Sequence, residues 1–312
     1  MRHPAPHRHN VTTKHHQPRK RTASRREPSF AVIVPCYDDG AVIARAIESC
    51  RGQSLAPSEI VVVDDGSKRA PPPAFDGVTL VRTQNRGLAA ARNTGVEHSK
   101  ADWLVFLDAD DVLPPTLLET YAHLLHTTDA DVVMTSWRRI AIDTGATLDQ
   151  HEAPRLGSDA FHALLLGNPI ACHAFTIHRH AFDAVGGFDR GLRSHEDWWL
   201  HLAVAAKGTR YARMDAPTVD YQVRNDSLST NRPAMLASGL AVLERAQAAH
   251  AGCPVCAELI PAARRRLCRH FLQEAAHGRP FDVARIAAIV RIAPREVLSA
   301  AVTRLMERAL RL

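Results

Sequence analysis

The sequence has 312 residues, of which 46% are hydrophobic, so it is long enough for a main domain with an appendage and can bury a full core. The net charge is +6, but the first 28 residues hold eight Lys or Arg against one Glu, which leaves the rest at about −1 (6 − 7). This balance excludes a basic nucleic-acid-binding core, and no apolar run approaches the about 18 residues of a membrane-spanning helix.

Residues 1–28 are rich in Arg, Lys, His and Pro and lack the apolar segment of a secretory signal. We expect a disordered, basic tail. We also expect a cytoplasmic chain whose six cysteines are mostly reduced. Peripheral contact of the chain with the inner face of a membrane stays open as an alternative.

Three hydrophobic runs in the first third of the chain predict buried β-strands. They lie at residues 31–34, where Pro35 is expected to end the strand, at 60–63 and at 103–107. None of them alternates between polar and apolar residues, which is typical of strands covered on both faces of a parallel sheet. Helical patterns at 41–50 and 88–97 separate the strands, so the sequence predicts an α/β fold.

Carboxylates gather where the second and third runs end. Asp64 and Asp65 precede a Gly-Ser turn, and Asp108, Asp110 and Asp111 follow the third run. Carboxylates so close repel one another unless a cation or water separates them. Open α/β sheets bind their ligands at this edge. A Mg²⁺-type ion that holds a diphosphate is the economical explanation, and a solvated acidic turn is the alternative.

Seven motifs between residues 30 and 230 follow one another in a recognisable order. They are Val34-Pro35-Cys36-Tyr37, Val63-Asp64-Asp65-Gly66-Ser67, Asn85-Arg86-Gly87-Leu88-Ala89-Ala90-Ala91-Arg92-Asn93, Asp108-Ala109-Asp110-Asp111, Gly186-Gly187-Phe188-Asp189, His195-Glu196-Asp197-Trp198-Trp199 and Tyr221-Gln222-Val223-Arg224-Asn225-Asp226-Ser227-Leu228-Ser229. In these motifs the chain resembles the inverting, nucleotide-sugar-dependent glycosyltransferases of family 2, which have the GT-A fold. The resemblance implies a Rossmann-like, mostly parallel central sheet with flanking helices over residues 29–233.

The resemblance also implies a nucleotide site made by Pro35, Tyr37, Asp65, Arg86 and Asp108. A tyrosine ring offers a stacking surface for a base, and a carboxylate accepts the imide N–H of uracil, which favours a UDP-linked donor. Arg86 could reach a phosphate. The alternatives are a partly buried loop aromatic for Tyr37 and, for Asp65, a cap on the turn that follows it.

The D-x-D segment is implied to hold the metal ion. Asp110, the last Asp of this segment, is the expected ligand of Mg²⁺ or Mn²⁺, and Asp108 is expected near the ribose or the waters of the ion. The ion would neutralise the charge that builds on the departing diphosphate. Asp111 is expected to cap a helix that begins at Pro114. Arg92 either reaches a phosphate or pairs in the interior with an Asp.

Asp197 is implied to be the catalytic base. An inverting displacement needs one base that removes the acceptor hydroxyl's proton while the sugar carbon is attacked from the face opposite the diphosphate. Glu196 lies beside Asp197 and is expected to raise its proton affinity by like-charge repulsion. The alternative, in which both acids form the charged first turn of a helix, is compatible with the catalytic role.

Four further residues are implied to line the donor or the acceptor, and they are Gly187, Glu196, Trp198 and Arg224. The Gly186-Gly187 turn is expected to need positive φ. Of Trp198 and Trp199, we expect one in the core and one as a sugar-stacking wall. Arg224 stands where the family commonly has His, and it can neutralise a diphosphate but cannot ligate a metal.

The C-terminal part, residues 234–312, predicts a helical appendage with helices at about 235–250, 257–276 and 281–311. The last of these is amphipathic and basic. Packing on the catalytic domain is the expected role of such a helix, and dimerisation or docking on a membrane surface are alternatives.

Four residues of this appendage offer candidate zinc ligands: Cys253, Cys256, Cys268 and His270. The C-x-x-C half has an acceptable spacing for zinc, but the single residue between Cys268 and His270 is atypical. Buried or incidental cysteines are therefore the favoured interpretation.

Together these patterns predict an inverting hexosyltransferase that moves a sugar from a nucleotide-diphospho sugar to a hydroxyl of a glycan, a lipid-linked glycan or a small molecule. Synthesis of the cell envelope or of exopolysaccharide is the expected context. The alternative is a degenerate transferase that serves as a sugar-nucleotide-binding or scaffold protein. A sugar nucleotidyltransferase would want a Gly-rich loop near Val34, and a dinucleotide oxidoreductase would want G-x-G-x-x-G after a strand, and neither pattern occurs.

Overall fold

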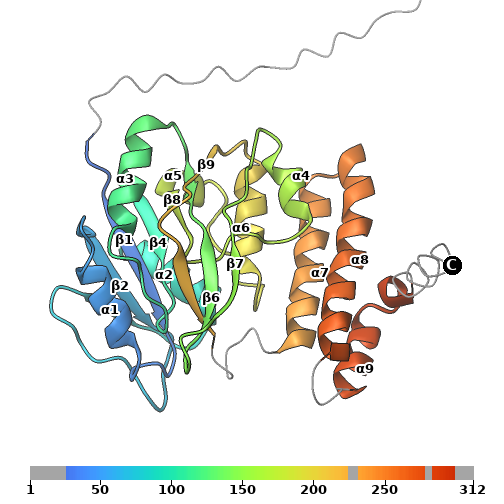
Figure 1. The fold of residues 1–312 in the computed structure, drawn as a ribbon, viewed down its shortest axis with the longest axis horizontal. Coiled ribbons are helices and arrows are strands. Elements are labelled where there is room, and N and C mark those ends of the chain that lie inside the picture. The colour runs from blue at the N-terminus through green and yellow to red at the C-terminus, as the bar shows by residue number, and fades with distance from the viewer. Residues whose placement is uncertain (1–25, 224–230, 278–282, 299–312) are drawn as a thin grey trace, which may run out of the picture.

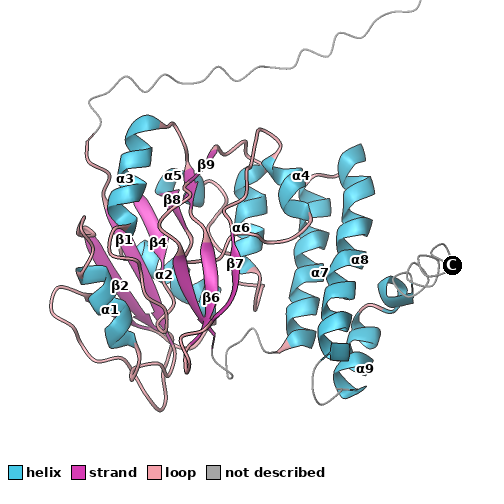
Figure 2. Cartoon of the chain, in the orientation of Figure 1, coloured by secondary structure: helices cyan, strands magenta, loops and turns pink. Residues whose placement is uncertain are grey.

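The computed structural model describes residues 26–223, 231–277 and 283–298 (Figures 1 and 2). The three hydrophobic runs form parallel strands in the middle of a sheet: β1 (Phe30–Cys36) lies between β2 (Glu59–Asp64) and β4 (Trp103–Phe106). Every residue of β1 and β4 is buried, which confirms the prediction of strands covered on both faces.

The main sheet has seven strands in the order β3-β2-β1-β4-β8-β5-β9. The remaining strands are β3 (Thr79–Arg82), β5 (Val132–Met134), β8 (Phe175–His178) and β9 (Tyr211–Arg213). The strand β8 is antiparallel to both of its neighbours, and all other pairs are parallel. The fold is therefore α/β with a mostly parallel central sheet.

Strand β1 does not end at Pro35, contrary to the prediction from sequence. Its pairing with β2 continues through Pro35 and Cys36, whereas its pairing with β4 ends at Ile33 opposite Phe106. Successive residues of a strand direct their N–H groups to opposite neighbours. The missing N–H of Pro35 thus ends only the ladder with β4, beyond which the two strands separate.

Successive side chains of β1 point to opposite faces of the sheet, and those on both faces are apolar. Helices therefore cover the sheet on both faces. Phe30, Val32 and Val34 pack with α1 (Ile43–Arg51) and α3 (Leu117–Thr127). On the other face, Ala31 and Ile33 pack with α2 (Leu88–Glu97) and α6 (Glu196–Ala205). Helix α2 comes so close to β1 that a Cβ at Gly95 would lie 2.2 Å from Cγ2 of Ile33.

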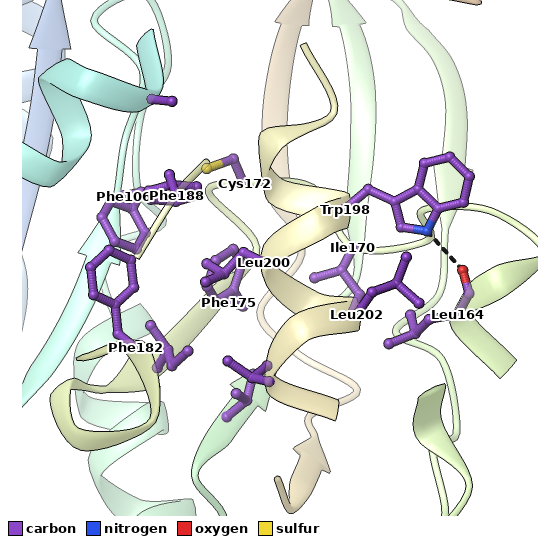
Figure 3. Packing of buried hydrophobic residues seen from close by; sticks show 14 of the residues in the cluster. Phe106, Leu164, Ile170, Cys172, Phe175, Phe182, Phe188, Trp198, Leu200 and Leu202 are labelled. Atoms are coloured by element: carbon purple, nitrogen blue, oxygen red, sulfur yellow. Dashed lines mark hydrogen bonds between the residues drawn. The ribbon is translucent and has the colours of Figure 1, made fainter. Parts of the chain in front are cut away.

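The core beside α6 is rich in large side chains (Figure 3). Phe106 of β4 lies 4.8 Å from Phe188 and 6.0 Å from Phe175, measured between ring centroids. Trp198 of α6 packs beside α4 (Ala160–Leu165), and its indole N–H donates to the carbonyl of Leu164 at 2.7 Å. Helix α6 is thereby held between the sheet and α4.

A small second sheet adjoins the carboxyl end of β4. It has the order β10-β6-β7 and consists of β6 (Trp137–Ala141), β7 (Thr147–His151) and β10 (Val219–Val223). A single bridge between Val112 and Asp220 joins β10 to the segment that follows β4. This bridge brings β10 next to the Asp-rich segment.

The C-terminal helices are α7 (Arg232–Ala249), α8 (Pro254–His277) and α9 (Val283–Ile292), which lie side by side at one end of the molecule (Figure 1). The first two match the predicted helices within a few residues. The predicted third helix is interrupted at Ala293, because the next residue is a proline and cannot continue the hydrogen-bond ladder.

The C-terminal helices pack on the rest of the chain: α7 contacts α6, and α8 contacts α4. Ile289 of α9 is buried against Leu236 of α7 and Phe271 of α8, so this part of α9 covers a core, as expected, but a core formed with the other C-terminal helices instead of with residues 29–233. The division of the chain at residue 233 stays a prediction. Among the described residues, no helix is both long enough and apolar enough to cross a membrane.

Candidate active site

Parallel pairing brings the predicted polar clusters to one edge of the sheet. Strands β2, β1 and β4 are neighbours in this order, and their carboxyl ends lead into Asp65, Tyr37 and Asp108. Tyr37 is 43% exposed. It therefore offers a surface on which a base could stack.

Asp65 is 4% exposed and anchors the Asn85-Arg86-Gly87 loop. Its two carboxylate oxygens accept the backbone N–H groups of Arg86 at 2.9 Å and Gly87 at 2.8 Å. The turn after β2 is capped instead by Asp64, whose Oδ1 accepts the N–H of Ser67 at 2.9 Å. The alternative role of Asp65 as the cap of that turn is therefore wrong, and its contact with a base stays a prediction.

Asp38 joins two loops of the site, a role that no sequence motif indicated. It has a positive φ of 57°, and its Oδ1 accepts the backbone N–H groups of Lys68, Arg69 and Ala70. These hydrogen bonds, led by those from Arg69 and Ala70, lower the pKa of Asp38 to about 2. They tie the loop that carries Tyr37 to the loop after β2. The sequence feature that could have indicated this role is an Asp directly after Tyr37, because Asp tolerates the left-handed backbone conformation better than most residues do.

Arg92 is a buried guanidinium that joins the two halves of the site. It is 1% exposed, and its Nη2 lies 2.6 Å from Oδ1 of Asp108 while its Nη1 lies 2.5 Å from Oε1 of Glu196. The structure therefore favours interior pairing of Arg92 with an Asp over a direct phosphate contact. Arg86, by contrast, is exposed, and its guanidinium reaches Thr94 at 3.5 Å.

Asp197 lies next to this buried ion pair, at the start of α6. Burial, followed by the charge of Glu196, raises the pKa of Asp197 to about 7, whereas Arg92 and hydrogen bonds from Trp198 and Asn168 oppose the shift. Repulsion from Glu196, which we predicted, thus contributes, but burial is the larger cause. A carboxylate with this proton affinity suits a general base near neutral pH. Asn168 was not identified from the sequence.

The Asp-rich segment has partly exposed and buried members. Asp108 and Asp110 are partly exposed, whereas Asp111 is fully buried. Asp111 accepts the backbone N–H of Gln222 in β10 at 2.7 Å, and its Oδ2 lies 3.3 Å from Nδ1 of buried His173. The capping role predicted for Asp111 is wrong, because α3 begins at Leu117 and the buried N–H of Gln222 needs an acceptor.

Burial also sets the protonation of the Asp111–His173 pair. Burial and the charges of Asp108 and Asp110 raise the pKa of Asp111 well above its usual range, and burial lowers the pKa of His173 to about 4. Ligand atoms of Asp108, Asp111 and His173 lie within 4.8 Å of one another. His173 carries no sequence signal, because it lies in a loop outside every motif.

The donor atoms at this edge fit a hard divalent cation. Carboxylate oxygens are the ligands that Mg²⁺ and Mn²⁺ prefer, and such ions keep positions open for phosphate oxygens. One oxygen of Asp108 is already paired with Arg92, so Asp108 has one oxygen left for an ion or its waters. The assignment of Asp110 as a ligand stays a prediction.

The Gly186-Gly187 turn has positive φ at both glycines, 78° and 76°, which confirms the prediction. It packs against α2, where the side chain of Asn93 accepts the N–H of Phe188 at 2.9 Å and donates to its carbonyl at 2.8 Å. A Cβ at Gly187 would lie 2.7 Å from Oδ1 of Asn93. Contact of Gly187 with a donor sugar stays a prediction.

Trp198 is the core member of the tryptophan pair, because it is 2% exposed and bonded to Leu164. A sugar-stacking role therefore falls to Trp199, which is only partly buried, and stays a prediction. Pro35 is buried within β1, and only Cys36 separates it from Tyr37 in the sequence. Arg224 lies outside the described residues.

Solved structures share this architecture. The chain aligns with Staphylococcus aureus TarS, residues 1–349, over 87% of this chain and 83% of that one, with a TM-score of 0.59 and 16% identity. It also aligns with the mannosyltransferase PcManGT of Pyrobaculum calidifontis over 90% of this chain and 88% of that one, with a TM-score of 0.54 and 18% identity. The fold is that of the GT-A class of transferases, with a C-terminal helical region.

The sequence comparisons then identify the family. Residues 31–186, half of the chain, match the family described as glycosyl transferase family 2. The chain therefore belongs to glycosyl transferase family 2 and is a glycosyltransferase.

Two curated relatives illustrate how far the similarity extends. The chain is 28% identical to the succinoglycan biosynthesis protein ExoO of Rhizobium meliloti over 70% of this chain and 69% of that protein. It is 30% identical to the putative glycosyltransferase EpsH of Bacillus subtilis, but this match spans only 39% of this chain and 37% of that protein.

Proposed function

We propose that this glycosyltransferase inverts the anomeric centre as it moves a sugar from a nucleotide-diphospho sugar to a hydroxyl group. The observation that carries the proposal is the contact of buried Arg92 with both Asp108 and Glu196. This contact joins the edge expected to bind the donor to the base Asp197, so a sugar carbon and an acceptor hydroxyl can be held in one site.

The donor side consists of Pro35, Tyr37, Asp65, Arg86 and Asp108. The exposed ring of Tyr37 stacks on the base, and exposed Arg86 neutralises a phosphate. Asp65 favours uracil, although backbone N–H groups already occupy part of its capacity to accept hydrogen bonds. A TarS structure contains UDP-GlcNAc, which supports a UDP-sugar, whereas the PcManGT structure contains GDP-Man.

Asp110, with Asp108 beside it, would hold Mg²⁺ or Mn²⁺, and the PcManGT structure contains Mn²⁺. When bound, such an ion would supply positive charge to the departing diphosphate. Arg224 would add a second positive group in the same place.

On the acceptor side, Asp197 removes the proton of the acceptor hydroxyl while the oxygen bonds to the anomeric carbon. The bond from that carbon to the diphosphate oxygen breaks, and the nucleoside diphosphate leaves with the electron pair. Gly187, Glu196 and Trp199 border the sugar and the acceptor. The similarity to ExoO supports an acceptor in exopolysaccharide synthesis.

The test is a transfer assay with UDP-, GDP- and dTDP-sugars and oligosaccharide acceptors, in which NMR determines the anomeric configuration of donor and product. We expect one donor class to give product of inverted configuration. A product that keeps the donor's configuration would overturn the inverting mechanism. Nucleotide binding without turnover of any donor would support the alternative, a degenerate transferase that binds sugar nucleotides.

A further inference from the structure

We propose that His162, His250, Cys253 and Cys256 bind one structural Zn²⁺ ion that fastens α4 to the beginning of α8. The four side chains come from two segments far apart in the sequence. His162 belongs to α4, His250 and Cys253 lie in the turn from α7 into α8, and Cys256 lies in the first turn of α8. One ligand atom from each of the four lies within 4.8 Å of those of the others.

The contacts within this cluster pair each sulfur with an imidazole nitrogen. Nε2 of His162 lies 3.3 Å from Sγ of Cys253, and Nδ1 of His250 lies 3.2 Å from Sγ of Cys256. Zinc binds sulfur at about 2.3 Å and nitrogen at about 2.0 Å in a tetrahedron, which places the ligand atoms roughly 3.3–3.8 Å apart. The cluster therefore needs only small movements to enclose the ion.

The ring of His162 is oriented as a zinc ligand requires. Its Nδ1 lies 2.5 Å from Oδ1 of Asp159, where its N–H can donate to the carboxylate, and Nε2 is the nitrogen that faces the sulfur and would bind the ion. Ligating histidines generally donate their other ring N–H to a carboxylate or a carbonyl in this manner. The ring of His250 is held by Phe161, with 4.6 Å between centroids.

The cluster replaces the ligand set considered from the sequence. Cys268 follows Cys256 by twelve residues of the continuous helix α8, which is a rise of about 18 Å. Cys268 packs in a separate apolar cluster with Leu240 and Phe271, and His270 contacts Glu274 at 3.6 Å. His162 could not be recognised from sequence, because only the contact between α4 and α8 brings it to the C-x-x-C turn.

Two soft sulfurs and two imidazoles favour zinc over the hard ions that suit the Asp-rich edge. Four protein ligands leave no open position, so the ion would be structural. The ion would hold α4, which contacts the acceptor side in two ways. The carbonyl of Leu164 in α4 accepts the indole N–H of Trp198, and Asn168, which follows α4, forms a hydrogen bond with Asp197. Zinc would thus stabilise the position of α4 beside Trp198 and Asp197.

The test measures the metal content of the full-length chain, purified without chelator and again after incubation with Zn²⁺ and dialysis. We expect about one zinc per chain. The Cys253→Ser/Cys256→Ser variant should lose it, and the matched control Cys268→Ala/His270→Gln should keep it. Less than about a fifth of an equivalent in the wild type, or unchanged zinc in Cys253→Ser/Cys256→Ser, would overturn the proposal.

The absorption spectrum of the Co²⁺-substituted wild type tests the metal site even if the Cys253→Ser/Cys256→Ser variant does not fold. After Co²⁺ replaces the bound metal, we expect intense ligand-field bands of a tetrahedral site together with thiolate charge-transfer absorption. His162→Gln should weaken or alter these bands. A weak octahedral spectrum without charge transfer would show that the thiols and imidazoles only hydrogen-bond to one another, and would overturn the site.

Discussion

The two clusters of candidate metal ligands in this chain differ in chemistry and in how the sequence encodes them. The Asp-rich edge offers oxygens from neighbouring residues, and two of its carboxylates, Asp108 and Asp110, are partly exposed. The Cys/His cluster offers sulfur and nitrogen from segments almost ninety residues apart. The first suits an ion that exchanges with substrate, and the second suits an ion that stays with the fold. Changes at the first should therefore affect chemistry, and changes at the second should affect stability.

The largest effect is expected from Asp197→Asn, which removes the proposed base and keeps the shape of the side chain. Transfer should fall by about 10²–10⁴-fold, because proton removal by a positioned base typically contributes this much. Affinity for the nucleoside diphosphate should stay near that of the wild type. Kinetics of sugar transfer and calorimetric titration of UDP measure the two quantities. Retained turnover would remove Asp197 as the base.

Arg92→Gln should give the next largest effect, on stability as well as on activity. It leaves Asp108 and Glu196 without their buried partner, so the free energy of unfolding should fall by about 3–5 kcal/mol. Arg82→Gln is the matched control, since Arg82 is exposed and lies 3.8 Å from Asp64. Its loss should cost under about 1 kcal/mol. Equal midpoints of urea unfolding for both variants would contradict the role given to Arg92.

Asp110→Ala should weaken metal-dependent binding of UDP by at least about tenfold, which corresponds to about 1.4 kcal/mol. Thermal stability should change little, in contrast to the Cys253→Ser/Cys256→Ser variant. Asp129→Ala is the control, because Asp129 is an exposed carboxylate that precedes β5. Calorimetry with and without Mn²⁺ checks the prediction, and unchanged affinities of Asp110→Ala would exclude this residue as a ligand.

The smallest effect is a shift in the pH dependence of transfer. Asp197 acts as a base only when it is deprotonated, and its pKa is raised to about 7. The rate should therefore fall by about tenfold per pH unit below this value and level off above it. In Glu196→Gln the inflection should move to lower pH, because the repelling charge is gone. A rate that is independent of pH between about 5.5 and 7.5 would contradict the assignment.

The sequence predicted the donor edge better than the acceptor side, for a physical reason. Strands covered on both faces have a plain apolar pattern, and the residues that follow them must meet at one edge, so Tyr37, Asp65 and Asp108 could be placed together. Their hydrogen bonds could not be predicted: Asp111 supports β10 instead of capping a helix, and Asp65 holds a loop. His173, Asn168 and His162 acquire partners only through tertiary packing.

The central claim is that the Asp-rich edge binds a nucleoside diphosphate together with an exchangeable cation. Calorimetric titration of UDP, GDP, CDP and dTDP into the full-length protein, with Mn²⁺ and with EDTA, tests it most directly. We predict selective binding of one nucleotide, expected to be UDP, that EDTA abolishes and Mn²⁺ restores. Binding of none of the four nucleotides, or affinities that do not change with the metal, would contradict the claim.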